Sequence, residues 1–507
     1  MWIGRIQVKA YFLFLPHIFI FGFFLSVVAA AEEPTPLSLK EAIQIALQNN
    51  SELQSGQEDI VLRDAALQIE ASQFDPSLRM NANLKQSMRE STAFAETGLT
   101  GNLFEQKDVQ IGLGWKTPLR WGGTTDLTLS QIKTDASFQR TNPTYQADLA
   151  VKWTQPLLQG FGEKITQGPL VIAKRQRDIS LLTLRSRVMD VVLKIVSLYW
   201  ELIFQAENLV VQKNSLNLAQ QLLEFNQTKV RLGLLAPIEI LVAESSVASR
   251  EEAVIVAEKE VRDVEDQLGN LIGLWGFSKP VSGRILAADR PVSDEIRLDP
   301  DDLLKSALAS RPEIVVAEDN IKNGNLSIEI AENQLRPSLD FVGVLGPSGI
   351  GGHVSDSLDQ LASRDFYRWE VGLLLGVSIG NKAATATVRK EKAGQQKLRL
   401  EKEKVISQIK LDVREGDRRV KSDFERIKAT RRALDLSKQQ LSSGEERFHL
   451  GLLSSHDIIE FQNDVAIAEG HSLRAIIDYN KSLANIYRVT GTLLEQYSIE
   501  TGYVGAG

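Results

Sequence analysis

The chain repeats itself at long range, and each repeat keeps a fixed register. A gapless shift of 261 positions, which carries residue 46 to residue 307, aligns two segments of similar sequence. A shift of 218 positions, which carries residue 232 to residue 450, aligns two later segments. The coinciding residues are Ala46, Leu47, Glu52, Gln73, Pro76, Ser77 and Leu78 with Ala307, Leu308, Glu313, Gln334, Pro337, Ser338 and Leu339, then Leu232, Gly233, Leu234, Leu235, Ile240, Val247, Glu251 and Gly273 with Leu450, Gly451, Leu452, Leu453, Ile458, Val465, Glu469 and Gly491. Repeats this long predict duplicated supersecondary units, here a first repeat over 32–292 and a second over 293–495.

The two shifts differ by about 43 residues, so the first repeat carries an insertion of that size between its matched blocks. At 507 residues the chain has room for several compact domains, but the duplication favours one elongated body instead.

Composition excludes several kinds of site. The chain has no cysteine, which rules out disulfides, thiolate catalysis and cysteine-ligated zinc. Its 58 basic and 65 acidic residues are mixed along the sequence, so no basic footprint for nucleic acid is present.

The N-terminal region is typical of a secretory signal. Arg5 and Lys9 precede an apolar run from Tyr11 to Val28, and three alanines end at Ala31. We expect residues 1–31 to form a signal peptide, with an uncleaved membrane anchor as the alternative. No run of 18 apolar residues follows, so a mature protein that enters a membrane must do so as a β-barrel.

Segments with helical periodicity precede segments that alternate. Residues 39–72 are predicted to be helical, and the matching segment 298–335 to break into two helices near Ser310 because Pro312 follows. Alternating apolar residues then predict strands at 77–89, 146–156, 338–346 and 367–380. Strands of about ten residues with one apolar face have the length that a tilted strand needs to cross a bilayer.

The insertion contains a further hairpin over 108–133, around Trp121-Gly122-Gly123. Whether this hairpin joins the sheet is left open by the sequence.

Two very long helical tracts follow the strands, at 168–232 and 382–450. Each is followed by a helix whose apolar residues step by three and four, from Ile240 to Leu271 and from Ile458 to Val489, with Arg250 the one charged exception. This seam predicts antiparallel coiled-coil hairpins over 168–273 and 382–492, with a short tail at 496–507. The predicted fold is thus mainly α with β: long helical hairpins plus a transmembrane β-barrel.

Four strands per chain cannot close a barrel, since transmembrane barrels start at about eight strands. We therefore expect the barrel to be completed by trimerisation, with twelve strands, or eighteen if the inserted hairpin joins.

Four motifs stand in this order of segments: LSLKEAIQIALQNN at 37–50, QPLL at 155–158, RLGLLAPIEIL at 231–241 and FHLGLLSSHDIIE at 448–460. With these motifs the chain resembles the TolC family of outer-membrane efflux channels. The resemblance covers nearly the whole sequence after the signal segment. It implies a homotrimer in outer-membrane lipid that extends into the periplasm and binds no cofactor. It also implies that a periplasmic adaptor and an inner-membrane pump or ABC exporter, as in type I secretion, open the channel at its periplasmic tip.

The resemblance implies a pore constriction at Asp457, Glu460 and Glu239, with Phe448 as a gate aromatic. Helix capping is the alternative for the acidic residues, because Ser454 to Asp457 fits a capping box and Pro237 starts the helix that holds Glu239. Leu453 occupies the place of a basic gate residue in the best-known member, which argues against a salt-bridge lock.

The repeated Leu-Gly-Leu-Leu turns are expected to dock the adaptor, although each glycine could serve only to end a helix. The turn residues are Leu232, Gly233, Leu234 and Leu235 in the first repeat and Leu450, Gly451, Leu452 and Leu453 in the second.

Other motifs carry no catalytic or metal chemistry. The glycine-rich segment 346–352 lacks the Gly-Lys-Ser/Thr ending of a phosphate loop, and we expect it to be an extracellular loop between strands. His449 and His456 flank a turn and have no third ligand at a fixed spacing, so we predict no metal site. No hydrolase or metalloprotease motif occurs, and an enzyme is not expected. The alternative function is a secreted or periplasmic coiled-coil scaffold.

Overall fold

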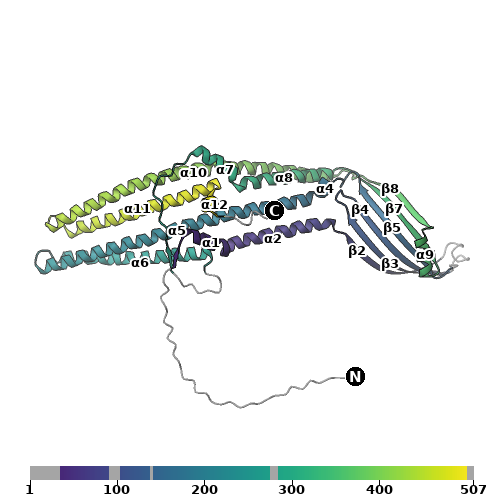
Figure 1. The fold of residues 1–507 in the computed structure, drawn as a ribbon, viewed down its shortest axis with the longest axis horizontal. Helices are drawn as coiled ribbons and strands as arrows, with labels where there is room; N and C mark the ends of the chain where they lie inside the picture. The colour runs from purple at the N-terminus through teal and green to yellow at the C-terminus, as the bar shows by residue number, and fades with distance from the viewer. Residues whose placement is uncertain (1–34, 91–102, 138–140, 275–283, 500–507) are drawn as a thin grey trace, which may run out of the picture.

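The computed structural model describes residues 35–90, 103–137, 141–274 and 284–499. The predicted signal peptide and most of the predicted tail lie outside the described residues. The chain forms an elongated body with a β-sheet at one end and two helical hairpins at the other (Figure 1).

The sheet is antiparallel and contains the inserted hairpin. The hairpin forms β3 and β4, which are hydrogen-bonded to each other and lie between β2 and β5. The strand order is β2 (Ser77–Glu90), β3 (Leu103–Pro118), β4 (Thr124–Ala136), β5 (Thr144–Pro156), β7 (Ser338–Gly351) and β8 (Tyr367–Gly376). Each chain therefore contributes six strands to one sheet.

The strand register separates an apolar face from a polar face. One row of paired residues crosses all six strands on the apolar face, and every side chain in it is exposed: Leu78, Trp115, Leu127, Val151, Leu345 and Trp369. The neighbouring row, on the other face, reads Ser77, Lys116, Asp126, Lys152, Val344 and Glu370. Successive residues of a strand point to opposite faces, so the alternation seen in sequence sorts the whole sheet into two surfaces.

Several strand boundaries differ from the predictions, and the inserted hairpin, predicted over 108–133, extends from Leu103 to Ala136. The prediction of a loop over residues 346–352 was wrong, because β7 continues to Gly351. A Cβ atom at Gly346 would lie 1.8 Å from the Leu149 carbonyl oxygen, so glycine there allows β5 and β7 to approach closely. Strand β8 ends at Gly376, before the predicted residue 380, because its partner β7 begins opposite, at Ser338.

The helices next to the sheet break at equivalent places in the two repeats. The expected single helix over 39–72 was wrong: it forms α1 (Leu39–Asn49) and α2 (Ser51–Ala71). Asn50 lies between them with φ −67° and ψ 123°, and its side chain accepts a hydrogen bond from the Leu53 N–H as an N-cap.

The second repeat has the same break. The predicted division near Ser310 is confirmed by α7 (Pro300–Ser310) and α8 (Pro312–Asn333). Arg311, which lies between them, has φ −76° and ψ 121° and is equivalent to Asn50 under the shift of 261.

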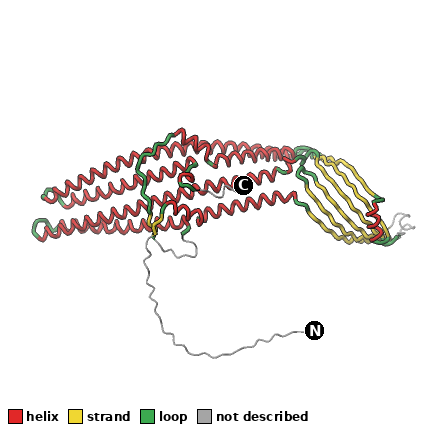
Figure 2. The backbone as a smooth tube through the Cα atoms, viewed as in Figure 1, coloured by secondary structure: helices red, strands yellow, loops and turns green. Residues whose placement is uncertain are grey.

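Two long helices run from the sheet to the far end of the molecule. Helix α5 (Gly168–Arg231) has 64 residues and α10 (Lys382–His449) has 68. At about 1.5 Å per residue each is roughly 95–105 Å long. Near the sheet they pack with α2 and α8, and at the other end with α6 (Ile238–Ile272) and α11 (Ser455–Thr490) (Figures 1 and 2).

The predicted seam is confirmed by burial. Its buried members in α6 include Ala243, Arg250, Ala257, Val261, Val264 and Leu268, and those in α11 include Ile458, Val465, Ala468, Ser472, Ala475, Tyr479, Ser482, Ile486 and Val489. Within the described ranges, no helix combines the length and the hydropathy needed to span a membrane.

Small elements surround the middle of the helical body. Strand β1 (Thr35–Leu37) pairs in parallel with β6 (Ile285–Ala287), and the Tyr199 hydroxyl of α5 donates to the Asp289 carboxylate at 2.7 Å beside them. Burial and this hydrogen bond raise the pKa of Tyr199 to about 12. The largest buried cluster lies here, where α1 and the middle of α5 meet the ends of α6 and α11. The remaining short helices are η1 (Ser72–Phe74), α4 (Glu163–Thr166), α9 (Val354–Ser363) and α12 (Leu493–Gln496).

Candidate functional site: the helical tip

Two helix turns of the same construction form the end of the body farthest from the sheet (Figure 2). Gly233 and Gly451 follow α5 and α10 with φ of +70° and +76°. In each turn the glycine N–H and the next N–H donate back into the last turn of the helix, as in Leu234 N–H to the Lys229 carbonyl at 2.8 Å and Leu452 N–H to the Arg447 carbonyl at 2.9 Å. This is the Schellman arrangement, in which a left-handed residue ends a helix. The helix-ending role of both glycines is therefore confirmed.

The leucines around these glycines divide into two sets. Leu232, Leu234, Leu450 and Leu452 are 66%, 63%, 75% and 64% exposed. Leu235 and Leu453 are half-buried, and Leu453 packs against a buried cluster at the tip. Each turn thus presents two leucines to its surroundings.

One of the acidic residues predicted at the constriction, Asp457, caps a helix. The Asp457 carboxylate accepts hydrogen bonds from the Ser454 N–H at 2.8 Å and the Ser454 hydroxyl at 2.7 Å, and the Asp457 N–H donates to the same hydroxyl. These bonds complete the predicted capping box and lower the pKa of Asp457. Glu239 lies in the first turn of α6, after Pro237.

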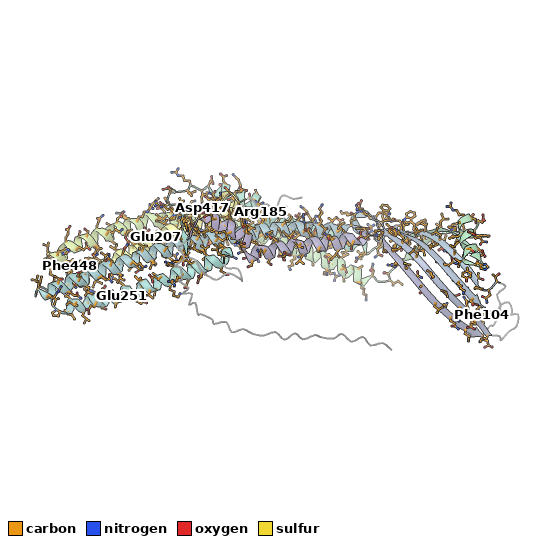
Figure 3. All side chains as sticks on the ribbon, turned by 60° about the horizontal axis from the view of Figure 1, so that its bottom comes forward. Phe104, Arg185, Glu207, Glu251, Asp417 and Phe448 are labelled. Carbon is orange, nitrogen blue, oxygen red and sulfur yellow. The ribbon has the colours of Figure 1, made fainter. Side chains whose placement is uncertain are left out.

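Phe448 lies inside the tip of its own protomer, where Figure 3 labels it at the end of the hairpins. It is 8% exposed and packs with Leu222, Phe225 and Ile458, its ring centroid 5.4 Å from that of Phe225. The cluster joins the two hairpins, because Leu222 and Phe225 belong to α5 and Ile458 to α11. Phe448 thus contributes to the packing of the tip within one chain.

Polar contacts also join the hairpins. The fully buried Asn226 amide donates to the Glu239 carbonyl oxygen at 3.1 Å and to the Ser455 hydroxyl at 2.9 Å. The sequence interpretation missed Asn226. Its equivalent under the shift of 218 is Gly444, and this departure from the repeat was the available signal.

Arg250, the charged exception in the seam, is buried and also joins the hairpins. Its guanidinium donates to the Ser215 carbonyl at 2.9 Å, to the Ser215 hydroxyl, and to the Ile459 carbonyl at 3.4 Å. Burial lowers the pKa of Arg250.

A groove of about 710 Å³ lies between α6 and α11, and Arg250 forms part of its lining. Glu460 is exposed in its wall and forms no ion pair with another residue that the structure describes. The polar lining consists of Ser245, Ser246, Ser249, Arg250, His456, Glu460 and Asn463. This wall combines hydroxyls, one free carboxylate and a buried cation.

The two histidines of the tip have different surroundings. The His449 ring stacks edge-on against Phe225 with centroids 5.4 Å apart, and His456 lines the groove. Among the residues that the structure describes, no group of three or more histidine or acidic side chains is placed to hold a metal ion.

Comparison with known proteins identifies the architecture. The outer-membrane channel OprN aligns with a TM-score of 0.67 and 16% identity over 90% of each chain. The CmeC outer-membrane channel of Campylobacter jejuni aligns with a TM-score of 0.66 and 16% identity over 90% of this chain and 86% of that one. The chain has the fold of the TolC-like outer-membrane factor channels. The predicted mainly α fold with long helical hairpins is confirmed.

Sequence comparison adds a relative of low identity. Nodulation protein T of Rhizobium leguminosarum bv. trifolii is 22% identical over 420 residues, which cover 78% of this chain and 83% of that protein. No protein-family model matches the chain. In this chain, the six-stranded sheet and the two-hairpin tip form the opposite ends of one protomer.

Proposed function

We propose that the chain is an outer-membrane exit channel, three copies of which form a barrel and a helical tunnel. An adaptor and an inner-membrane pump or ABC exporter open its tip, and cargo passes without chemical change. The observation that carries this proposal is the exposed apolar row that crosses all six strands of a sheet whose other face is mainly polar. Exposing such an apolar surface to water is unfavourable, whereas the hydrocarbon of a lipid bilayer accommodates it.

The edges of the sheet support assembly with other copies. Within the described part of one chain, β2 and β8 each pair on one side only. Unpaired backbone groups cannot remain in lipid, so the edges must pair with other copies. Three copies of a six-stranded sheet would close a barrel of eighteen strands, which the inserted hairpin makes wider than a twelve-stranded barrel.

Membrane fractionation and conductance test this proposal. We expect the protein to sediment with outer membranes, to need detergent for extraction, and to run as a heat-labile trimer. In planar bilayers the trimer should conduct ions. A monomer that is soluble without detergent would instead support the coiled-coil scaffold.

At the tip we propose that Glu460, with Asp457 and Glu239, sets the charge of the constriction, and that Phe448 holds the hairpins that surround it. Three copies of an exposed carboxylate near a narrow pore favour cations. Glu460 is the cleanest test, because Asp457 is also engaged in capping.

Glu460→Gln is expected to lower the cation preference of the channel without changing the stability of the trimer. The reversal potential in a salt gradient across a planar bilayer measures this preference. Glu244→Gln is the matched control, because Glu244 is exposed on α6 but does not line the groove. Equal reversal potentials for the wild type and Glu460→Gln would show that this carboxylate does not line the conducting path.

We propose that the exposed turn leucines bind the adaptor. Leu232→Glu combined with Leu450→Glu is expected to abolish crosslinking of the adaptor to a photoreactive residue placed at Leu234, because an apolar contact is replaced by two charges. Ile255→Glu is the control, since Ile255 is equally exposed on α6 but lies away from the turns. If the double variant still crosslinks as strongly as the wild type, the turns serve only to end the helices.

A further inference from the structure

Helix α9 packs on the sheet at the end farthest from the hairpins (Figure 1). It lies so close to β7 that two glycines are required beneath it. A Cβ atom at Gly349 would lie 2.1 Å from the Ser357 carbonyl oxygen, and one at Gly351 would lie 2.5 Å from the Asp356 Cβ. Hydrogen bonds from Gln131 Nε2 to the Ser357 hydroxyl at 3.3 Å and from the Ile350 N–H to Gln360 Oε1 at 2.9 Å hold the helix in place.

The register shows which face of the sheet α9 covers. Gly349 is paired with Ala147, and Ala147 with Gln131. Ala147 lies four residues before Val151 on β5, and Gly349 four residues after Leu345 on β7, so these residues share the apolar face. The helix therefore lies on the apolar face, and Ala147 beneath it is fully buried. A plug for the pore would lie on the polar face instead.

The sides of α9 differ in polarity. Ser357, Gln360 and Leu361 face the sheet. One flank carries Val354, Leu358 and Ala362, which are exposed and spaced by four residues, and the other carries Ser355, Asp356, Asp359 and Ser363.

The direction of these flanks follows from one contact. Asp356 lies against Gly351, the last residue of β7, so the polar flank faces the end of the strand. The apolar flank, on the opposite side of the helix, then faces back along the sheet toward Leu345 and its paired Trp369.

We propose that α9 is an interfacial helix on the outside of the barrel, with its apolar flank in the hydrocarbon of the outer leaflet and its polar flank at the headgroups. The occupant of this surface is lipid, because the exposed apolar flank continues the apolar face of the sheet. The helix also covers Gln131, an amide on the apolar face that would otherwise meet hydrocarbon. This inference rests on the proposed channel function.

Spin labels can test the position of α9, because the chain has no cysteine of its own. Leu358→Cys, Asp359→Cys and Leu373→Cys would be labelled separately in the full-length trimer, reconstituted in phosphatidylcholine vesicles. Collision with oxygen reports lipid exposure, and collision with a water-soluble nickel complex reports water exposure. Leu373, in the middle of the apolar face of β8, is the lipid reference.

We expect the ratio of oxygen to nickel collision rates to be several-fold higher at residue 358 than at residue 359, and to approach the ratio at residue 373. A water-exposed 358 with a lipid-exposed 373 would overturn the inference and leave the channel standing. A 358 label shielded from both reagents, or a 359 label as lipid-exposed as 358, would also overturn it. If 358 and 373 are both water-exposed, the proposed function itself fails.

Discussion

Leu373→Arg is expected to destabilise the assembled trimer far more than Leu374→Arg. The two residues are neighbours in β8 and are 66% and 65% exposed in one chain, but they lie on opposite faces of the sheet. Leu373 is paired with Phe341 on the apolar face, and Leu374 with Asp340 on the polar face. An arginine on the lipid face near the bilayer midplane costs about 2–4 kcal/mol, and each trimer would carry three.

The temperature at which the trimer dissociates on a semi-native gel measures this difference, together with the yield of trimer in the outer membrane. The two variants share the strand, the exposure of the replaced residue and the introduced residue. A difference between them therefore reports which face of the sheet contacts lipid. Equal losses in both variants would mean that the apolar face is not the lipid face.

Arg488→Met is expected to destabilise the helical body by about 2–3 kcal/mol. The Arg488 guanidinium lies in α11 and binds Asp190 of α5 at 2.7 Å and Glu313 of α8 at 3.2 Å, so it joins the two repeats. Its side chain is 11% exposed, and without it the Glu313 carboxylate keeps only Arg311. The expected decrease in the free energy of unfolding is smaller than for breaking a fully buried ion pair, because the Asp190 side chain is half-exposed.

Chemical unfolding of the trimer in detergent measures the loss. Arg474→Met is the control in the same helix, because the Arg474 side chain is 40% exposed and Lys481 also binds its partner Glu201. Because Arg474 itself is partly exposed and Lys481 still neutralises Glu201 after the substitution, the expected loss is that of a surface pair, about 0–1 kcal/mol. If both variants lose the same stability, the Arg488 network does not hold the repeats together.

The pH dependence of this effect has a definite sign. Burial raises the pKa of Glu313, but hydrogen bonds from Arg311 and the positive charges of Arg311 and Arg488 outweigh it, so the pKa lies below the ordinary value of 4.5. A carboxylate with a lowered pKa stabilises the folded state above its unfolded pKa and loses this contribution as the pH falls through the folded value. The stability difference between wild type and Arg488→Met is therefore expected to be full at neutral pH and to shrink below pH 4.5.

Local patterns in the sequence predicted the parts of the tip that local forces build. The two glycine turns, the capping box at Ser454 and the buried seam of α6 and α11 each depend on residues within a few positions of one another. The break at Asn50 was missed because no proline marks it, although Arg311 lies at the equivalent break in the second repeat.

Contacts between distant segments escaped prediction. Asn226 looks like one polar residue in a long helix, and its burial follows only from the approach of Ser455, 229 positions away. The extension of β7 through its glycines likewise depends on β5 and α9, which pack against it.

The sequence by itself determined the duplication, the helical and strand periods, the turn glycines and the two-faced character of the strands. These features arise from backbone geometry and from the alternation of apolar and polar residues along a single segment. Only the tertiary structure decided that the inserted hairpin lies between β2 and β5, that Phe448 packs between the hairpins, and that α9 covers the apolar face. Those outcomes depend on which distant surfaces come into contact. The free energy of such contacts comes from shape complementarity and burial across the whole fold, and the periodicity of a single segment does not contain that information.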